Sequence, residues 1–218
     1  MPEAVAAIDA QKSSARWFAE PFRIFFPVGL LLGAIGVALW PLFAWHAIEF
    51  YPAQAHVRLM IEGLMGSFII GFLGTAGPRL LDASPLSAAE VFALLSLQIL
   101  SAFLHLTQRQ TAGDIIFLVL LLLFLGMMAR RARARHDLPP PNFVLVLFGL
   151  LNAVAGIFLL TAAKSLTNGL FANQLGSLML NEGLFCFPFS VSARFSFRNS
   201  SAARNPSRPI CESRLLCG

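Results

Sequence analysis

Long apolar runs alternate with short polar segments along most of the chain. A helix needs roughly 20 apolar residues to cross a bilayer, and several of these runs approach or exceed that length. The predicted spans cover about residues 22–43, 53–77, 86–106, 114–129, 143–163 and 170–189. The last one begins like a span and then loses its apolar character. The sequence therefore predicts an all-α, polytopic transmembrane helix bundle of five spans plus a partial sixth.

The second predicted span differs from an ordinary apolar helix. Its first two turns carry His56, Arg58 and Glu62, and five glycines follow before Arg79. At about 100° per residue, His56, Met60 and most of these glycines project onto one face of the helix. A smooth face lets two helix backbones approach closely in lipid, or leaves room for a flat cofactor. The glycines assigned to helix packing are Gly63, Gly66, Gly74 and Gly77.

The fourth predicted span carries almost no polar side chain between Asp114 and Met128. This composition is typical of a helix that faces lipid, so we expect the span to form an outer wall of the bundle. An arginine-rich segment, residues 130–135, follows at once.

Composition and charge support a membrane protein and argue against a nucleic-acid partner. The chain is 57% hydrophobic and 12% charged, with a net charge of +5. Five arginines and one glutamate after residue 190 account for +4 of that charge, which leaves only +1 for the rest. Lipid is the expected partner, and other membrane proteins or a second copy of the chain are further candidates.

The distribution of Lys and Arg predicts the orientation of the spans. With residues 1–20 as a cytoplasmic lead-in, the cytoplasmic segments hold eight Lys and Arg, and the outer segments hold only Arg58, Arg109 and Lys164. Because positive charge is enriched on the cytoplasmic side, the N-terminus is predicted to lie inside. His46 and His56 then lie on the outer side.

The last segment, residues 190–218, contains seven serines and five arginines without an apolar period. It is either a natural disordered tail or the product of a frameshift or truncation after about residue 185. We favour the second explanation, because a native tail normally begins after a span is complete. All three cysteines lie in the last 33 residues, so the bundle offers no cysteine-based metal site.

His56 and His46 are the first candidates for chemistry. Two imidazoles on the outer side could bind a haem iron or a copper ion, with Met60 as a soft second ligand. The structural alternatives are an interfacial histidine for His46, which we favour, and a hydrogen-bonded helix start for His56, which remains equally open. His105 is predicted to lie level with His56, where a shared site is geometrically possible, although a lone histidine there more often binds a backbone carbonyl or interfacial water.

Other polar residues are spaced so that they share helix faces. Arg58 and Glu62 are i,i+4 neighbours and are predicted to form an ion pair. The alternatives are a contact from Arg58 to a haem propionate and a proton relay through Glu62. In the sixth segment, Asn173, Ser177 and Asn181 form a stripe that we expect to face the bundle interior. No phosphate loop, nucleophile elbow or HExxH motif is present, so the spacing of the residues alone does not indicate a reaction.

Three segments resemble the NnrS family: Phe22–Gly29, His56–Pro78 and Asn181–Gly183. The resemblance implies a bacterial inner-membrane protein linked to nitric oxide metabolism and denitrification, which holds haem and copper. Many members open the second span with His-Ala-His-Glu. Here His56 matches the first histidine, whereas Arg58 and Leu59 stand at the positions of the second histidine and the glutamate.

The resemblance implies a metal centre near His56, His105 and His46, with Met60 and Arg58 beside the cofactor. Family members continue well past residue 190, which agrees with a truncated chain. Two other functions stay open. One is a small-solute or ion transporter whose pathway is lined by the glycine face. The other is a non-catalytic module that helps to assemble a membrane complex.

Overall fold

The computed structural model describes residues 20–133, 141–162 and 169–184. These residues form helices joined by short turns, and they include no strand. The helices are α2 (Phe22–Ala44), α3 (Ala53–Arg58), η1 (Leu59–Met65), α4 (Gly66–Leu80), α5 (Ala88–Leu106), α6 (Gln110–Arg133), α7 (Pro141–Ala162) and a further helix over residues 169–184.

Four helical stretches are long and apolar enough to cross a membrane. They are α2, the continuous helix Ala53–Leu80, α5 and α6, and α7 contributes a shorter apolar helix over Val146–Ala162. The predicted all-α membrane bundle is therefore confirmed, while the exact number of spans stays a prediction. The lead-in up to residue 19, the tail over residues 190–218 and the end of the sixth segment lie outside the described residues.

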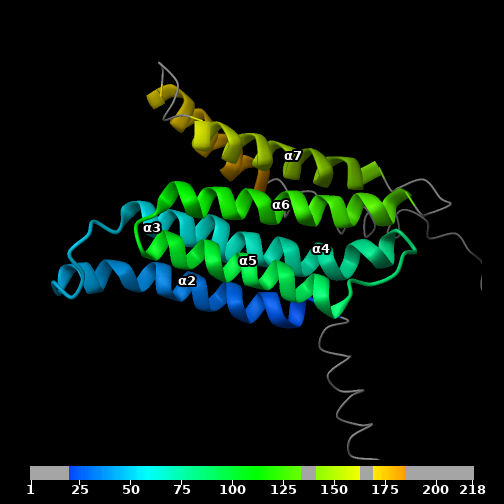
Figure 1. Ribbon diagram of the computed structural model, residues 1–218, viewed down its shortest axis with the longest axis horizontal. Helices are drawn as coiled ribbons and strands as arrows, with labels where there is room; N and C mark the ends of the chain where they lie inside the picture. Colours follow the sequence, from blue (N-terminus) through cyan, green and yellow to red (C-terminus); the bar gives the residue numbers. More distant parts are fainter. Residues whose placement is uncertain (1–19, 134–140, 163–168, 185–218) are drawn as a thin grey trace, which may run out of the picture.

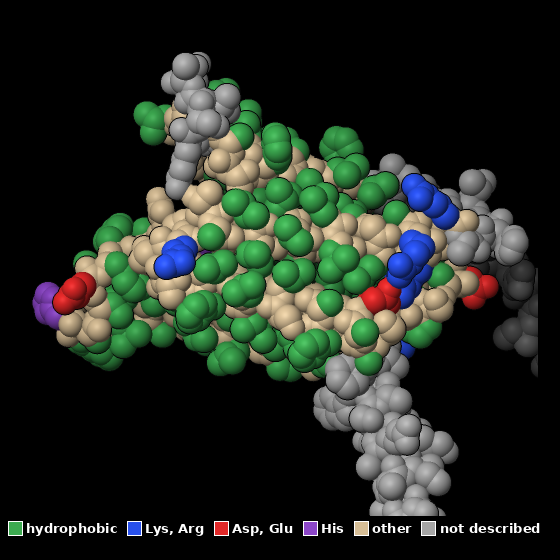
Figure 2. Space-filling model, in the orientation of Figure 1, with side chains coloured by type: hydrophobic (Ala, Val, Ile, Leu, Met, Phe, Trp, Pro, Cys, Tyr) green, Lys and Arg blue, Asp and Glu red, His purple; other side chains and the backbone are tan. Residues whose placement is uncertain are grey.

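The helices run roughly side by side along the long axis of the molecule (Figure 1). The second span packs against α2, α5 packs against α6, and α7 lies along α6. Hydrophobic side chains cover the middle of the face in Figure 2, and the visible charged side chains lie toward its two ends. This distribution suits a bilayer whose hydrocarbon core surrounds the middle of the bundle.

The α6 helix buries one of its faces in the bundle. Phe117, Leu120, Leu121 and Phe124 are all 0% exposed, and they pack between α5, α4 and α7. The expectation of a lipid-facing wall holds for one face of α6 only, because Ile115, Val119 and Leu122 are 46%, 45% and 51% exposed on the opposite side. Lipid tails and helix interfaces are similarly apolar, so composition alone does not tell a lipid-facing helix from a buried one.

One end of the bundle is held by a capping box and a buried arginine. Ser87 begins α5, its hydroxyl accepts from the Glu90 amide, and the Glu90 carboxylate accepts from the Ser87 amide. The same carboxylate pairs with Arg131 of α6. The Arg131 guanidinium also donates to the carbonyls of Ser84 and Pro85 at 3.0 and 3.2 Å. The start of α5 and the end of α6 are thereby fastened together.

At the same end, Glu20 connects the start of α2 to the end of α4. Its carboxylate pairs with Arg23 and, at 3.0 Å, with Arg79. The hydrogen bond from Arg23 and then the one from Arg79 lower the pKa of the Glu20 carboxyl. All three side chains lie outside the buried core, so the contact is exposed to solvent screening.

The second span contains a π-helical turn, η1, between two α-helical parts. A π turn closes i→i+5 hydrogen bonds and holds more residues than an α turn, so residues beyond it leave the α-helical projection. Gly63 lies against α2, where an added Cβ would come within 3.2 Å of Leu32 Cβ. Gly74 lies on the same side, and an added Cβ there would be 3.4 Å from Pro21.

The other two packing glycines meet a different helix. An added Cβ on Gly66 would lie 2.9 Å from the Phe117 ring, and one on Gly77 would lie 3.3 Å from Met128 Sδ, both in α6. The expectation of a single smooth glycine face is therefore wrong. The span is sandwiched between α2 and α6, and its glycines allow close approach on both sides.

The α7 helix and the helix over residues 169–184 touch through their backbones. An added Cβ on Gly156 would lie 2.6 Å from the Leu180 nitrogen, and one on Gly183 would lie 2.6 Å from the Ala153 nitrogen. Only glycine allows two helix backbones to come this close. This pair of helices forms one wall of the cavity described below.

Candidate functional site

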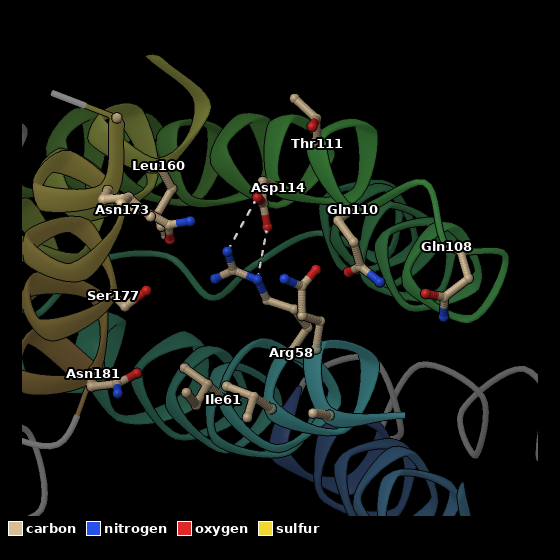
Figure 3. A pocket seen from close by; sticks show the side chains of 15 residues that line it. Arg58, Ile61, Gln108, Gln110, Thr111, Asp114, Leu160, Asn173, Ser177 and Asn181 are labelled. Atoms are coloured by element: carbon tan, nitrogen blue, oxygen red, sulfur yellow. Dashed lines mark hydrogen bonds and ion pairs between the residues drawn. The ribbon is translucent and has the colours of Figure 1, made fainter. Parts of the chain in front are cut away.

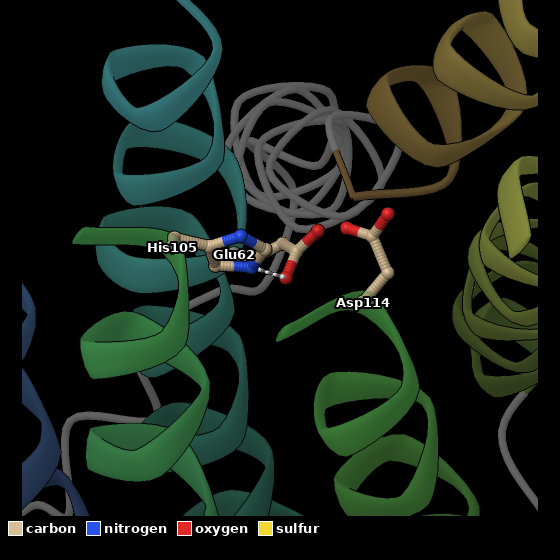
Figure 4. Close-up of side chains that lie close together, drawn as sticks. All are labelled: Glu62, His105 and Asp114. Carbon is tan, nitrogen blue, oxygen red and sulfur yellow. Dashed lines mark hydrogen bonds and ion pairs between the residues drawn. The ribbon is translucent and has the colours of Figure 1, made fainter. Parts of the chain in front are cut away.

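Three ionisable side chains from three helices meet inside the bundle. Glu62 of η1, His105 of α5 and Asp114 of α6 are 1%, 1% and 5% exposed. One ligand atom from each lies within 4.8 Å of those from the other two (Figure 4). We call these three residues the acid–histidine cluster. Ionisable groups buried at membrane depth are costly, so such a cluster is a functional-site candidate.

The orientation of the His105 ring follows from its neighbours. Gln110 Nε2 donates to the His105 carbonyl at 3.3 Å, which directs Gln110 Oε1 toward the ring, 2.8 Å from Nδ1. Because that oxygen only accepts, the hydrogen-bond network assigns a hydrogen to Nδ1. The other nitrogen, Nε2, lies 3.0 Å from Glu62 Oε2. One proton is therefore held between His105 Nε2 and Glu62 Oε2.

Glycine makes room for this ring. An added Cβ on Gly113 would overlap the His105 ring at Cε1, so any side chain there would displace the imidazole. The Gly113 carbonyl also accepts from Ser101 Oγ at 3.1 Å. The start of α6 is thus fitted closely to the end of α5 around His105.

Arg58 joins the two carboxylates of the cluster. Its Nη1 lies 3.2 Å from Glu62 Oε1, one helical turn along the same span. Its Nε and Nη2 lie 3.1 and 3.2 Å from Asp114 Oδ1 and Oδ2, an arrangement with two prongs. The guanidinium and the shared proton together balance the two carboxylates, so the group is formally neutral.

The π turn presents backbone carbonyls to α5. Gln98 Nε2 donates to the Glu62 carbonyl at 2.8 Å and approaches the Gly63 carbonyl at 3.4 Å. A widened turn exposes carbonyls that a regular α-helix would use internally. Gln98, Ser101 and His105 are each 1% exposed, and this stripe of α5 therefore supports the cluster along its length.

Two carboxylate oxygens of the cluster accept no hydrogen bond from the described residues. They are Glu62 Oε1 and Asp114 Oδ1. Arg58 nitrogens approach both to 3.1–3.2 Å, so their charge is paired although no N–H points at them within hydrogen-bond geometry. Buried oxygens are normally satisfied, and both atoms therefore keep capacity for a further cation or donor.

A cavity of about 730 Å³ adjoins the cluster (Figure 3). Arg58 and Asp114 line one side, and Asn173, Ser177 and Asn181 line the opposite side from the helix over residues 169–184. These three residues therefore line the cavity, with Asn173 also exposed, and the packing of this stripe against partner helices stays a prediction.

The structure places His56 and Met60 on the other side of the same span. His56 Nδ1 lies 2.9 Å from the Gly36 carbonyl of α2, so Nδ1 donates and Nε2 is the ring nitrogen left to bind a metal. The His56 ring lies edge-on to Trp40, at 6.0 Å between centroids. The Met60 methyl group also reaches Gly36, where it would be 3.4 Å from an added Cβ.

The structure does not bring the three predicted metal-ligand histidines together. His46 is exposed in the turn after α2, with a φ of 56°. Within the described residues, the group of acid and histidine ligands includes His105 but neither His46 nor His56. Their metal roles stay predictions, and a single shared site is not the arrangement observed.

Asp114 and Gln110 are the site residues that sequence reasoning missed. The apolar run predicts a span that starts at Asp114, but α6 begins at Gln110, so Asp114 lies inside the helix. The available signal was a lone acid at the edge of a long apolar run. Such a residue faces a protein interior more often than lipid.

Comparison with characterised proteins and with solved structures gave no match. The family model described as "NnrS protein" matches residues 16–193. That range includes every helix described above, the π turn, the acid–histidine cluster and the site of His56. By this match, the chain belongs to the NnrS family.

Proposed function

We propose that this protein is an inner-membrane NnrS protein that binds haem, copper or both, and acts in nitric oxide metabolism and denitrification stress. Family membership and the apolar spans support the general assignment. The observation that carries the metal role is the fixed ring of His56, whose Nδ1 is bound to the carbonyl of Gly36, the same glycine that the Met60 methyl group reaches.

The donors at this position fit the groups that the family implies. Haem iron and copper both accept an imidazole nitrogen and a thioether sulfur. A ligating histidine commonly donates its other N–H to a carbonyl, which orients the ring toward the metal. His56 would hold the metal through Nε2, and Met60 would supply the softer donor. When bound, such a centre supplies a site that binds nitric oxide or exchanges an electron with it.

His105 fits haem poorly. Its ring is 1% exposed, both nitrogens contact side chains, and Gly113 lies directly against it. A porphyrin plane would have to displace the α5–α6 contact to reach Nε2. Arg58 likewise contacts Glu62 and Asp114, so its predicted contact with a haem propionate requires those two ion pairs to break.

The visible spectrum of the detergent-purified full chain tests this proposal. We expect a Soret band, or stoichiometric copper by elemental analysis, that is lost in His56→Ala. His46→Ala is the matched control, since His46 is an exposed histidine at the same end, and we expect it to keep the cofactor. A folded, colourless and copper-free protein would contradict the proposal. Growth of a strain carrying His56→Ala under nitric oxide stress tests the biological role.

A small-solute or ion transporter is the second candidate. The cavity beside Arg58 and Asp114 favours it, because amide and hydroxyl side chains line the opposite wall. Solute flux in proteoliposomes that is lost in Asn173→Leu and in Asn181→Leu, in a protein without bound metal, would support transport over metal binding.

A further inference from the structure

We propose that Glu62, His105 and Asp114 form a second site, separate from His56, for a divalent transition-metal ion. In this site Arg58 is a built-in cation that the metal replaces. The proposal rests on donor geometry, on unsatisfied oxygens, on the charge count and on the adjoining cavity.

The donor atoms are close enough to share one ion. Metal bonds to imidazole and carboxylate are about 2.0–2.2 Å long, so two ligands of one ion lie up to about 4.4 Å apart. The cluster's ligand atoms all lie within 4.8 Å of one another. Small side-chain rotations would therefore complete the site, and the helix backbones can stay where they are.

The His105 ring already has the arrangement of a metal ligand. Its Nδ1 hydrogen is directed to Gln110 Oε1 at 2.8 Å, and Nε2 faces Glu62 at 3.0 Å. Outer hydrogen bonds of this kind fix the tautomer and the ring orientation of ligating histidines. The proton between Nε2 and Glu62 occupies the position that a metal ion would take.

The unsatisfied atoms indicate a cation rather than an anion. Glu62 Oε1 and Asp114 Oδ1 are both buried carboxylate oxygens that accept no hydrogen bond from the described residues and lie 3.2 and 3.1 Å from the Arg58 guanidinium. One nitrogen and two carboxylates, without sulfur, suit borderline or hard divalent ions such as Zn²⁺, Fe²⁺ and Mn²⁺. This donor set differs from the nitrogen and sulfur donors of His56 and Met60.

The charges balance when Arg58 leaves. Arg58 and the shared proton together supply two positive charges to the two carboxylates, and a divalent ion supplies the same two. The Arg58 side chain is 14% exposed and lines the cavity. Asn173 and Ser177 on the opposite wall offer oxygen acceptors to a guanidinium that turns into the cavity.

Competition between Arg58 and the metal separates this proposal from a purely structural ion-pair network. The test uses the full chain in detergent, treated with chelator and titrated calorimetrically with Zn²⁺, with Mn²⁺ binding followed by electron paramagnetic resonance. Removing one nearby positive charge in Arg58→Ala should tighten Zn²⁺ binding about tenfold. Arg58→Lys, which keeps the charge, should bind like the unchanged protein.

The ligand variants should lose the ion. We expect Glu62→Gln and Asp114→Asn to weaken Zn²⁺ binding by about 100-fold or more, and Gln110→Ala by about tenfold. Glu49→Gln is the matched control, because Glu49 is an exposed acid at the same end. It should leave the affinity unchanged.

Thermal unfolding gives a second readout that does not depend on an unstable variant. Zn²⁺ should raise the unfolding temperature of the unchanged protein and leave that of Asp114→Asn unchanged. Binding that survives in Glu62→Gln, or that is no tighter in a folded Arg58→Ala, overturns the proposal. The Soret band and copper content at His56 are measured separately, so either proposal can fail without the other.

Discussion

Arg58 and Asp114 form a two-pronged ion pair between residues 56 positions apart in sequence. The guanidinium Nε and Nη2 lie 3.1 and 3.2 Å from the two carboxylate oxygens. Arg58 lies at the end of α3 and Asp114 lies just over one turn into α6, so this pair joins the second span to α6 beside the cavity.

Removing one partner of this ion pair should destabilise the bundle strongly. Arg58→Met leaves two buried carboxylates with less compensation, and we expect a loss of about 3–5 kcal/mol in the free energy of unfolding. The double variant Arg58→Met with Asp114→Leu should recover most of that loss, because it removes one of the two uncompensated carboxylates. Unfolding in mixed micelles measures both. A double variant no more stable than Arg58→Met would contradict this account.

The glycine contact between α7 and the helix over residues 169–184 should tolerate no side chain. The Cβ that Gly156→Ala adds would lie only 2.6 Å from the backbone nitrogen of Leu180. We expect a loss of about 1–3 kcal/mol from the forced separation of the two backbones. Gly126→Ala in α6 is the control, since an added Cβ there meets nothing within 4 Å. It should leave stability unchanged or raise it slightly through helix propensity.

Two adjacent arginines at the end of α6 should contribute very differently to the free energy of unfolding. The Arg131 side chain is 8% exposed and the Arg130 side chain 72% exposed, although both pair with Glu90. Arg131→Ala should cost about 3 kcal/mol of unfolding free energy, because it removes the buried partner of Glu90 and the donor to three backbone carbonyls. Arg130→Ala should cost about 1 kcal/mol or less, as exposed ion pairs do. Equal effects would mean that burial is not what matters here.

Glu20 should give a small dependence of stability on pH. Hydrogen bonds from Arg23 and Arg79 lower the pKa of its carboxyl from 4.5. Because the pKa of Glu20 is lower in the folded state, its ion pairs stabilise the fold fully at a pH above 4.5. This stabilisation is lost as the pH falls through the pKa that Glu20 has in the folded state. Unfolding temperatures measured across that range should fall less steeply in Glu20→Gln than in the unchanged protein. Parallel curves would contradict this assignment.

The spans could be predicted from sequence because apolar length reports membrane crossing directly. Helix ends and neighbours could not be predicted in the same way. The start of α6 was placed at Asp114 because the apolar run begins there, whereas the helix begins at Gln110. The burial of Phe117 and Phe124 depends on which helix covers α6, and one sequence does not specify that.

The candidate site was predicted only in part. The residues singled out for their polarity or sulfur within apolar helices were His56, Met60, Arg58, Glu62 and His105. A regular helical projection puts Arg58 and Glu62 about 160° and 120° from His56, but it does not say which neighbouring helices these side chains meet. The packing of α5 and α6 against this span brings Glu62 together with His105 and Asp114, and His56 lies on the α2 side.

The wide turn of η1 makes the second span sensitive to chain length. A π turn is equivalent to an α-helix with an inserted residue. Deleting one residue between Leu59 and Met65 would restore regular winding and leave the α-helical parts on either side in about their present orientation. The change would fall on the turn itself: the Glu62 and Gly63 carbonyls that accept from Gln98 would return to the hydrogen bonds of a regular helix, and the Glu62 side chain would be redirected. The register of one residue, as much as the identity of any ligand, decides which groups meet in this membrane bundle.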